Sequence, residues 1–393
     1  MSKLIYLIIC FLIVGNSFVF SQDKDFQSFL LQSSIENEPG YISELPMIDN
    51  INNFIIINIQ IDGKNLNFIF DTGSMLSAIS KEAAGDTKHL KKISLTDGSG
   101  KDEKVNTVKK DIQLNDILFK QIGFAVIDFE HINKYSCIQI DGILGANAIR
   151  LCNWQINPSN QILKLSDVPF IFDSEALEID LKFYNGLLPI IELNFGGDKF
   201  MTLLDTGYSD TLSINKNFYS NSKKFNQLTT YSGNGVFIGT YKKLIEQEIK
   251  KVELDSIQIN AHLFTNVESY ITDEKPLLGN GFLKDYKTTI NIETNKLYLD
   301  SLKKEHVKNK DFGLSFTFND KKEMIIAFVW ENSQLNKHGV KFGDRITQIN
   351  GVKTDKVDEE TYCRIKEELQ SLDNVVISIL QNKVEHTYSL IRN

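Results

Sequence analysis

The sequence has little cysteine, proline and histidine, and it lacks long hydrophobic runs beyond its N-terminal segment. Among 393 residues there are only 4 cysteines, 6 prolines and 6 histidines. So few cysteines exclude a disulfide-rich scaffold, and so few prolines exclude a proline-rich or collagen-like chain. Positive charge is also scarce, because 43 basic residues face 51 acidic ones and the formal net charge is −8. We therefore expect no nucleic-acid partner, since binding nucleic acid requires a basic surface.

Residues 1–21 have the pattern of a secretory signal peptide. Lys3 precedes an apolar stretch over residues 4–14, and small or polar residues follow at 15–17. This order is typical of signal peptides. The apolar stretch is shorter than the roughly 20 residues that a membrane span needs, although an uncleaved N-terminal anchor is the alternative. We expect an exported protein, periplasmic or extracellular, with no membrane span in the mature chain.

The remaining composition is that of a globular protein. Hydrophobic residues make up 42% of the chain and charged residues 24%, and the length suits two to four domains. Three cysteines, Cys137, Cys152 and Cys363, follow the predicted signal peptide. A Cys137–Cys152 bridge is one interpretation, and separate buried thiols are the other. Since the chain has neither a Cys-x-x-Cys pair nor a histidine cluster, we expect no metal site.

The chain contains an internal repeat. Asp71-Thr72-Gly73 and Asp205-Thr206-Gly207 each follow an apolar segment, and the two aspartates are 134 residues apart. Other pairs keep this offset: Gly63 with Gly197, Ile143-Leu144-Gly145 with Leu277-Leu278-Gly279, Ile156 with Ile290, and Leu163 with Leu297. A register kept over about 100 residues indicates a duplicated domain.

Each copy is predicted to be mostly β. In the first, the β-branched run 54–61 ends at the turn Asp62-Gly63, and a second strand over 67–70 leads to Asp71. In the second, the corresponding strands are 187–195 and 200–204, joined at Gly196-Gly197. Short strands separated by glycine-rich loops at this spacing indicate closed β-barrels or sandwiches.

The paired aspartates point to hydrolysis by an activated water. If the two copies pack about a pseudo-twofold axis, Asp71 and Asp205 meet, and two carboxyl groups about 3 Å apart share one proton. The ionised member then takes a proton from water while the protonated member donates to a carbonyl oxygen. A threonine hydroxyl beside each aspartate can hold the loop, and the glycine permits a tight turn. An ordinary strand-to-turn connection would not explain the registered repeat.

These motifs resemble those of the aspartic peptidases, especially the bacterial retropepsin-like enzymes with two lobes in one chain. The resemblance covers roughly residues 46–303 and implies two tandem β-barrel lobes, 46–167 and 168–303, that form an intramolecular pseudo-dimer. It implies that Asp71 and Asp205 are catalytic, supported by Thr72, Gly73, Ser74, Thr206 and Gly207. The Ile143-Leu144-Gly145 and Leu277-Leu278-Gly279 elements are expected to pack beside the catalytic loops. Pairing of each lobe with another chain is the alternative, although the duplication favours pairing within one chain.

Two parts of the chain match the family pattern less closely. The family has β-hairpin flaps, for which the candidates are Gly98 and Gly100 in one copy and Gly233 and Gly235 in the other. The residue after Asp-Thr-Gly is usually small, as Ser74 is, whereas the second copy has Tyr208. A large ring there is expected to displace the loop, alter the hydrogen bonds of the dyad or form part of a subsite. A catalytically inactive protein of the same fold, which binds peptides, is therefore the alternative.

The C-terminal residues 304–393 resemble a PDZ domain. The run Gly339 to Gly351, with Gly343-Asp344 and Ile349-Asn350-Gly351, carries the resemblance. A strand is predicted over 324–330, a helix over 359–369, and strands over 375–381 and 386–391. The resemblance implies that Gly313-Leu314-Ser315-Phe316 hold a peptide C-terminus in a groove beside the helix. A module that only packs on the rest of the chain is the alternative.

The sequence therefore predicts a mainly β, exported aspartic endopeptidase that acts on peptide or protein substrates. Water would be activated between Asp71 and Asp205, without metal or organic cofactor. The PDZ domain would recruit peptide C-termini or regulate access to the cleft. Residues 22–45 form an N-terminal extension, in which Phe26, Phe29 and Leu30 are expected to pair with a lobe, act as a propeptide or remain loose.

Overall fold

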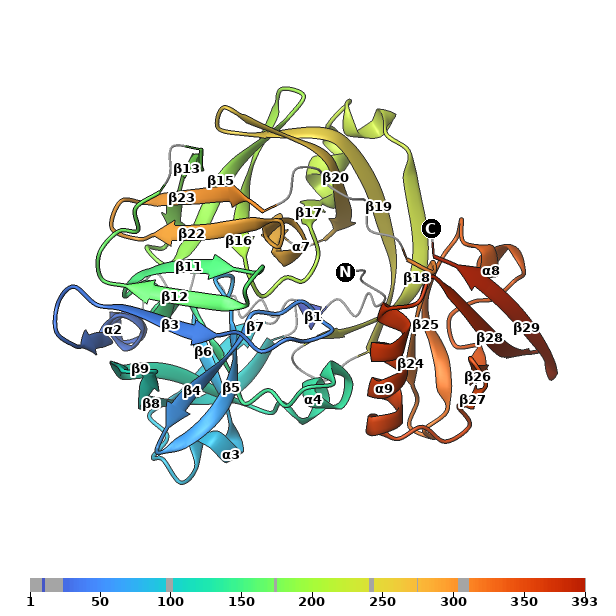
Figure 1. Cartoon of the computed structure of the whole chain (residues 1–393), viewed down its shortest axis with the longest axis horizontal. Coiled ribbons are helices and arrows are strands. Elements are labelled where there is room, and N and C mark those ends of the chain that lie inside the picture. Colours follow the sequence, from blue (N-terminus) through green and yellow to red (C-terminus); the bar gives the residue numbers. More distant parts are fainter. Residues whose placement is uncertain are drawn as a thin grey trace.

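The computed structural model of the chain is mainly β and describes residues 9–10, 24–96, 102–172, 175–239, 244–273, 275–302 and 311–392. Its described strands form hydrogen-bonded sheets of eight, fifteen and six strands. Two closed barrels of six strands each are contained in the two larger sheets. The six-stranded sheet runs between the barrels (Figure 1). Most of the predicted signal peptide lies outside the described residues.

The first barrel is closed by its long hairpin. Its strands are β4 (Ile56–Ile61), β5 (Lys64–Phe70), β10 (Gly142–Leu144), β6 (Ser77–Ser80), β9 (Ile117–Ile127) and β8 (Asp102–Leu114). The barrel closes because β8 pairs with β9 and also with β4, where Gln60 lies opposite Gln113. β7 (Lys92–Thr96) extends the sheet, and the short helices α3 (Lys81–Ala84), α4 (Glu130–Ser136) and α5 (Ala146–Ile149) connect the strands.

The second barrel repeats this order. Its strands are β15 (Leu188–Phe195), β16 (Asp198–Asp205), β21 (Leu277–Gly279), β17 (Leu212–Asn215), β20 (His262–Thr272) and β19 (Leu244–Ile259). It closes where Leu193 of β15 lies opposite Ile259 of β19. Neighbouring elements are β14 (Lys182–Tyr184), α6 (Lys216–Asn221), the 3-10 turn η1 (Phe225–Gln227), β18 (Thr230–Gly239) and α7 (Asn280–Leu283). Each barrel has its own apolar core.

The predicted hairpin turns are confirmed. Asp62 and Gly63 both have positive φ, and they join Ile61 to Lys64, which lie opposite one another. Gly196 and Gly197 also have positive φ and join Phe195 to Asp198. Two-residue turns of this kind match the twist of the flanking strands, and glycine adopts them without a steric penalty.

The six-stranded sheet shows the relation between the halves of the chain. Its order is β13 (Leu177–Asp180), β23 (Lys296–Ser301), β22 (Tyr286–Asn291), β11 (Asn153–Asn157), β12 (Ile162–Ser166) and β3 (Ile42–Pro46). At its centre Gln155 lies opposite Thr289, 134 residues later, and its amide donates to the threonine hydroxyl at 3.0 Å. On either side, Trp154 faces Ile290 and Ile156 faces Thr288. This register is unchanged when the two copies are exchanged, so the sheet has pseudo-twofold symmetry.

The N-terminal extension packs on the first barrel. α2 (Lys24–Leu31) buries Phe26, Phe29 and Leu30, and β2 (Ser34–Glu36) pairs with β9. Of the three expectations for this segment, pairing with a lobe is therefore the one observed.

β1 (Ile9–Cys10) pairs with β18. The described helices include none that is both long and apolar enough to cross a membrane.

The C-terminal part adds a sheet and a helix beside the second barrel. Its elements are β24 (Leu314–Phe318), β25 (Met324–Trp330), α8 (Gln334–Lys337), β26 (Arg345–Ile349), β27 (Val352–Lys353), α9 (Glu359–Gln370), β28 (Asn374–Gln381) and β29 (Val384–Ile391). The predicted strands and the predicted helix are found within one or two residues of their expected ends. β25 pairs with β18, so this sheet is continuous with the second barrel (Figure 1).

The disulfide differs from the sequence prediction. Cys137 is bonded to Cys363, with 5.3 Å between their Cα atoms, and Cys152 is a buried free thiol. The Cys137–Cys152 bridge is therefore wrong, and of the alternative, two separate buried residues, Cys152 is confirmed as a buried thiol while Cys137 is bonded to Cys363. The partners are 226 residues apart, and they meet because α9 of the C-terminal part packs on α4 of the first half.

Candidate active site

Asp71 and Asp205 occupy corresponding places in the two barrels. Asp71 directly follows β5, and Asp205 is the last residue of β16. In each barrel a short parallel strand borders the strand that leads to the aspartate. Leu144 lies opposite Phe70, and Leu278 lies opposite Leu204. The Ile143–Gly145 and Leu277–Gly279 elements thus pack beside the aspartate loops, where sequence analysis expects them.

The two threonines link the loops reciprocally. The Thr72 hydroxyl donates to the Leu204 carbonyl at 2.6 Å and accepts from the Thr206 amide at 3.1 Å. The Thr206 hydroxyl donates to the Phe70 carbonyl at 2.8 Å and accepts from the Thr72 amide at 3.0 Å. All four bonds cross between the halves and are buried, so they fix the separation of the two aspartates.

Each glycine of the Asp-Thr-Gly motifs faces the aspartate of the other half. A Cβ atom built on Gly73 would lie 2.3 Å from Cγ of Asp205, and one built on Gly207 would lie 2.4 Å from Cγ of Asp71. No side chain larger than hydrogen fits at either position. The two carboxyl groups are therefore brought together between the two glycine backbones.

Burial and mutual repulsion set the protonation of the pair. Asp71 is fully buried and Asp205 is 2% exposed. Desolvation, followed by the charge of Asp205, raises the pKa of Asp71 well above its usual value, against the lowering effect of the Gly73 and Ser74 amides. Burial raises the pKa of Asp205 to about 6, while the Gly207 amide and the side chain of Asp71 oppose the rise. The two carboxyl groups therefore ionise one after the other, and the pair keeps one proton after the first ionisation.

Tyr208 does not displace the second loop. Its amide lowers the pKa of Asp205 and donates to the Asp205 backbone carbonyl at 3.2 Å, whereas the Ser74 amide donates to Oδ1 of Asp71 at 3.0 Å. Its carbonyl accepts from the Asn280 amide at 2.8 Å, as the Ser74 carbonyl accepts from Ala146 at 2.7 Å. The ring is 2% exposed and packs in a core cluster with Leu187, Leu203 and Leu277. The expected displacement of the loop is therefore not observed, whereas the hydrogen bonds of the dyad do differ, because the Tyr208 amide donates to the Asp205 backbone carbonyl and the Ser74 amide to the Asp71 carboxyl group.

The second loop absorbs one additional residue after Tyr208. In the first half the Asn147 amide donates to Met75, the residue directly after Ser74. In the second half the corresponding Gly281 amide donates to Asp210, two residues after Tyr208. Ser209 is thus an insertion that leaves both ends of the loop in register.

Asn280 is a site residue that sequence analysis missed. Its side-chain amide donates to the Thr206 carbonyl at 2.6 Å and to the Asn53 carbonyl at 3.0 Å, linking the second aspartate loop to the first half. Its counterpart Ala146 has no such group. The available signal was an amide side chain directly after Leu277-Leu278-Gly279, at the start of a short helix.

The flap candidates are only partly covered by the structure. Gly98 and Gly100 lie outside the described residues. Gly233 and Gly235 lie within β18, where they face Trp330 and Phe328 of β25. They are therefore strand residues in contact with the C-terminal sheet, and the strand continues past them to Gly239.

The predicted peptide-binding residues form the start of β24. Gly313 has a φ of 75°, and Leu314, Ser315 and Phe316 are buried in the strand that follows. In the described residues β24 pairs only with β25, and the Tyr362 hydroxyl of α9 donates to the Phe316 carbonyl at 3.4 Å.

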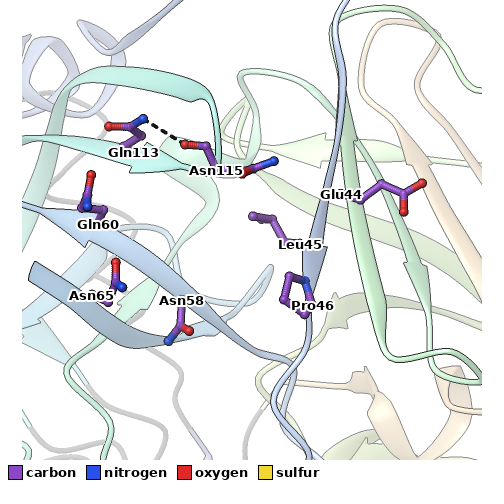
Figure 2. Close-up of a pocket in the computed structure, with 8 residues that line it drawn as sticks. All are labelled: Glu44, Leu45, Pro46, Asn58, Gln60, Asn65, Gln113 and Asn115. Carbon is purple, nitrogen blue, oxygen red and sulfur yellow. Dashed lines mark hydrogen bonds between the residues drawn. The ribbon is translucent and has the colours of Figure 1, made fainter.

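A separate polar pocket of about 230 Å³ lies on the first barrel. Figure 2 shows Asn58, Gln60 and Asn65 on one side of it and Leu45 and Pro46 on the other. The Gln113 amide donates to the Asn115 carbonyl there. No aspartate of the dyad lines this pocket, and no predicted site residue does.

Across the described ranges, His, Cys, Asp and Glu side chains form no group of three that could hold a metal.

Comparison with known proteins agrees with the first half of this geometry. Residues 57–148 are similar to the aspartyl protease family. This match covers the first barrel with Asp71 and supports a retropepsin-like, aspartic-type hydrolase domain there. It ends before Asp205. No curated protein matches the chain.

Proposed function

We propose that this protein is an exported aspartic endopeptidase whose single active site is shared between the two halves of one chain. The observation that carries the proposal is the reciprocal arrangement of Asp71-Thr72-Gly73 and Asp205-Thr206-Gly207. Each threonine bonds to the other strand, and each glycine leaves space for the other carboxyl group. A strand-to-turn connection in a protein without catalytic function would require neither.

The proposed mechanism follows from the two unequal carboxyl groups. Asp205, whose pKa is about 6, is the general base that takes a proton from water. Asp71, whose pKa is raised well above its usual value, is the acid that donates a proton to the carbonyl oxygen of the substrate. The water oxygen then bonds to the carbonyl carbon, and a tetrahedral intermediate forms without a covalent bond to the enzyme. Its collapse breaks the C–N bond as the nitrogen receives a proton.

We also propose the domain organisation expected from the sequence. Residues 46–167 and 168–303 are the two lobes of the peptidase, and 304–393 are a PDZ-like domain with a groove between β24 and α9. Residues 1–21 direct export to the periplasm or the medium. The long, specific pattern from Gly339 to Gly351 supports the PDZ-like assignment.

The alternative is a peptide-binding protein of the same fold without turnover. It rests on Tyr208, and the bond from the Asn280 amide to the Tyr208 carbonyl, which matches the one from Ala146 to Ser74, weakens it. The two functions differ in whether a bound peptide is hydrolysed.

The deciding experiment is cleavage of an unbiased peptide mixture by residues 22–393 between pH 3 and 8, read by mass spectrometry. Asp71→Asn and Asp205→Asn are tested beside Asp62→Asn, an exposed aspartate in a hairpin turn. We expect internal cleavage that either dyad substitution abolishes and Asp62→Asn leaves intact. Turnover that survives both dyad substitutions would contradict the aspartic mechanism. A folded wild type without turnover at any pH would support the peptide-binding alternative.

A further inference from the structure

The groove between β24 and α9 is the surface where a PDZ-like domain would add a peptide strand. One edge of β24 is paired with β25, and the described strands leave its other edge unpaired. Nevertheless every residue of β24 is buried. Another segment of this chain must therefore cover the strand.

The covering segment is α4 of the first half. The Tyr135 ring of α4 lies 5.2 Å from the ring of Phe318 in β24 and 6.5 Å from that of Tyr362 in α9. Phe318 and Tyr362 are themselves 5.1 Å apart, and all three rings are at most 3% exposed. Tyr135 thus lies between the strand and the helix at the Phe318 end of β24, where the chain of a peptide whose C-terminus is bound at Gly313 would have to pass.

Polar and covalent bonds hold α4 in this position. The disulfide joins Cys137, directly after α4, to Cys363 of α9. Lys366 of α9 is fully buried, and its Nζ donates a hydrogen bond to the Tyr135 carbonyl at 3.3 Å. The Gln370 amide, at the end of α9, donates to the Ile51 carbonyl at 3.4 Å. A disulfide and two hydrogen bonds therefore hold α9 against the first half of the chain.

The C-terminal sheet is also joined to the second half, by strand pairing. β25 pairs with β18, and a Cβ atom on Gly233 would lie 2.2 Å from Cζ of Phe328. A Cβ atom on Gly235 would lie 2.4 Å from the Ala327 carbonyl oxygen. The two glycines that sequence analysis assigned to a flap thus allow β25 to lie close to β18. The C-terminal domain contacts the first half through α4 and the second half through β18 (Figure 1).

We propose that α4 is the resident ligand of the strand–helix groove, and that the C-terminal domain is a brace joining both halves of the peptidase. This inference rests on the PDZ-like assignment of the proposed function and is independent of catalysis. While the Cys137–Cys363 bond is intact, an external peptide C-terminus has no access to the groove.

The brace is linked to the first aspartate loop by consecutive bonds. Asn133 of α4 exchanges two hydrogen bonds with the backbone of Ile140, at 2.9 and 3.0 Å. Ile140 leads into β10, and the Leu144 carbonyl at the end of β10 accepts from the Asp71 amide at 3.0 Å. A displacement of α4 would therefore reach β10, which pairs with the strand before Asp71.

The test measures binding of fluorescent peptides that carry random C-terminal residues and a free carboxylate, with amidated peptides as the control. All proteins carry Asp71→Asn, so that no peptide is cleaved. The opened protein adds Tyr135→Ala, Cys137→Ser and Cys363→Ser, and the matched control adds Tyr184→Ala and Cys152→Ser, outside the groove. Reducing the parent protein with dithiothreitol breaks the Cys137–Cys363 disulfide without any substitution. The dithiol supplies two electrons and two protons, becomes a cyclic disulfide and leaves Cys137 and Cys363 as thiols.

We expect the parent and the control to bind free-carboxylate and amidated peptides with equal affinity, through the proposed active site alone, and the opened or reduced protein to bind free carboxylates at least tenfold more tightly than amidated ones. A parent that prefers free carboxylates as strongly as the opened protein does would overturn the proposal. If no form prefers free carboxylates, the PDZ-like assignment fails, and hydrogen exchange then tests the brace alone. Faster exchange in α4, α9 and β10 of the opened protein supports the brace, and unchanged exchange overturns it.

Discussion

Gly73 of one half lies directly against the carboxyl group of Asp205 of the other half. A methyl group at Gly73 would be 2.3 Å from Cγ and 2.4 Å from Oδ2 of Asp205. The opposite contact, between Gly207 and Asp71, repeats this arrangement. A dyad built in this way depends on both glycines, because each provides the space in which the other aspartate lies.

Gly73→Ala is therefore expected to reduce kcat at least about 100-fold, since misplacing a catalytic group by about 1 Å has an effect of this size. The measurement is steady-state cleavage of a peptide identified in the mixture experiment. Gly63→Ala is the control for replacing a glycine away from the site: no atom lies within 4 Å of the added Cβ, and the positive φ of Gly63 is expected to cost stability without lowering kcat. An active Gly73→Ala enzyme would contradict the close packing of the two loops.

The pH dependence of kcat/KM should be bell-shaped. Activity requires ionised Asp205 and protonated Asp71, and the pKa of Asp205 is about 6 while that of Asp71 is well above its usual value. The rate is expected to rise as the pH increases through about 6 and to fall at higher pH, when Asp71 loses its proton. Because the groups are coupled, both limbs belong to the pair. A profile that falls steadily from pH 4 to 7 would contradict this assignment.

Asp71→Asn is expected to stabilise the protein at neutral pH while abolishing catalysis. A carboxyl group with a raised pKa favours folding below its unfolded pKa of about 4, and this contribution is lost as the pH rises through the folded value. Asparagine does not ionise, so the variant does not lose this stabilising contribution as the pH rises. The free energy of unfolding at pH 7 should rise, and the gain should vanish below about pH 4. Urea unfolding at both pH values measures it, and equal stability at pH 7 would contradict the raised pKa.

The sequence predicts those parts of the site that are determined by a local pattern of residues. The 134-residue offset aligns Asp71 with Asp205 and Ile143–Gly145 with Leu277–Gly279, and each aspartate follows an apolar strand that ends in a turn. Tyr208 was expected to disturb this pattern. Its effect could not be read from the sequence because it depends on a one-residue insertion at Ser209 and on a core contributed by distant strands.

Contacts between distant segments were not predictable. The Cys137–Cys363 bond and the β18–β25 pairing both depend on how the C-terminal domain docks. Hydrophobic periodicity defines α9 and β25 individually, because it reports which face of an element is buried. It does not report the partner that buries that face. For the same reason Gly233 and Gly235 resemble turn residues in the sequence, although they lie in β18 and allow the close approach of β25.

Thr72→Ala should destabilise the protein by about 2 to 4 kcal/mol, because the Leu204 carbonyl and the Thr206 amide would each lose a buried partner. Thr72→Ser keeps the hydroxyl and is expected to retain most of the stability and the activity. Urea unfolding of the two variants makes the comparison. Equal loss in both would assign the effect to the threonine methyl group and contradict the role of the reciprocal hydrogen bonds.

Tyr208→Ser restores the small residue that the resemblance leads one to expect, and the structure predicts that it is harmful. The ring is 2% exposed and packs with Leu187, Leu203 and Leu277, so its removal leaves a cavity beside the loop that carries Asp205. We expect a loss of about 3 kcal/mol in the free energy of unfolding and a lower kcat, whereas Tyr208→Phe, which keeps the ring, should retain most of both. Urea unfolding and peptide cleavage measure the two effects. If Tyr208→Ser were more active than the wild type, the ring would be an obstacle to catalysis, and the peptide-binding alternative would regain its main support.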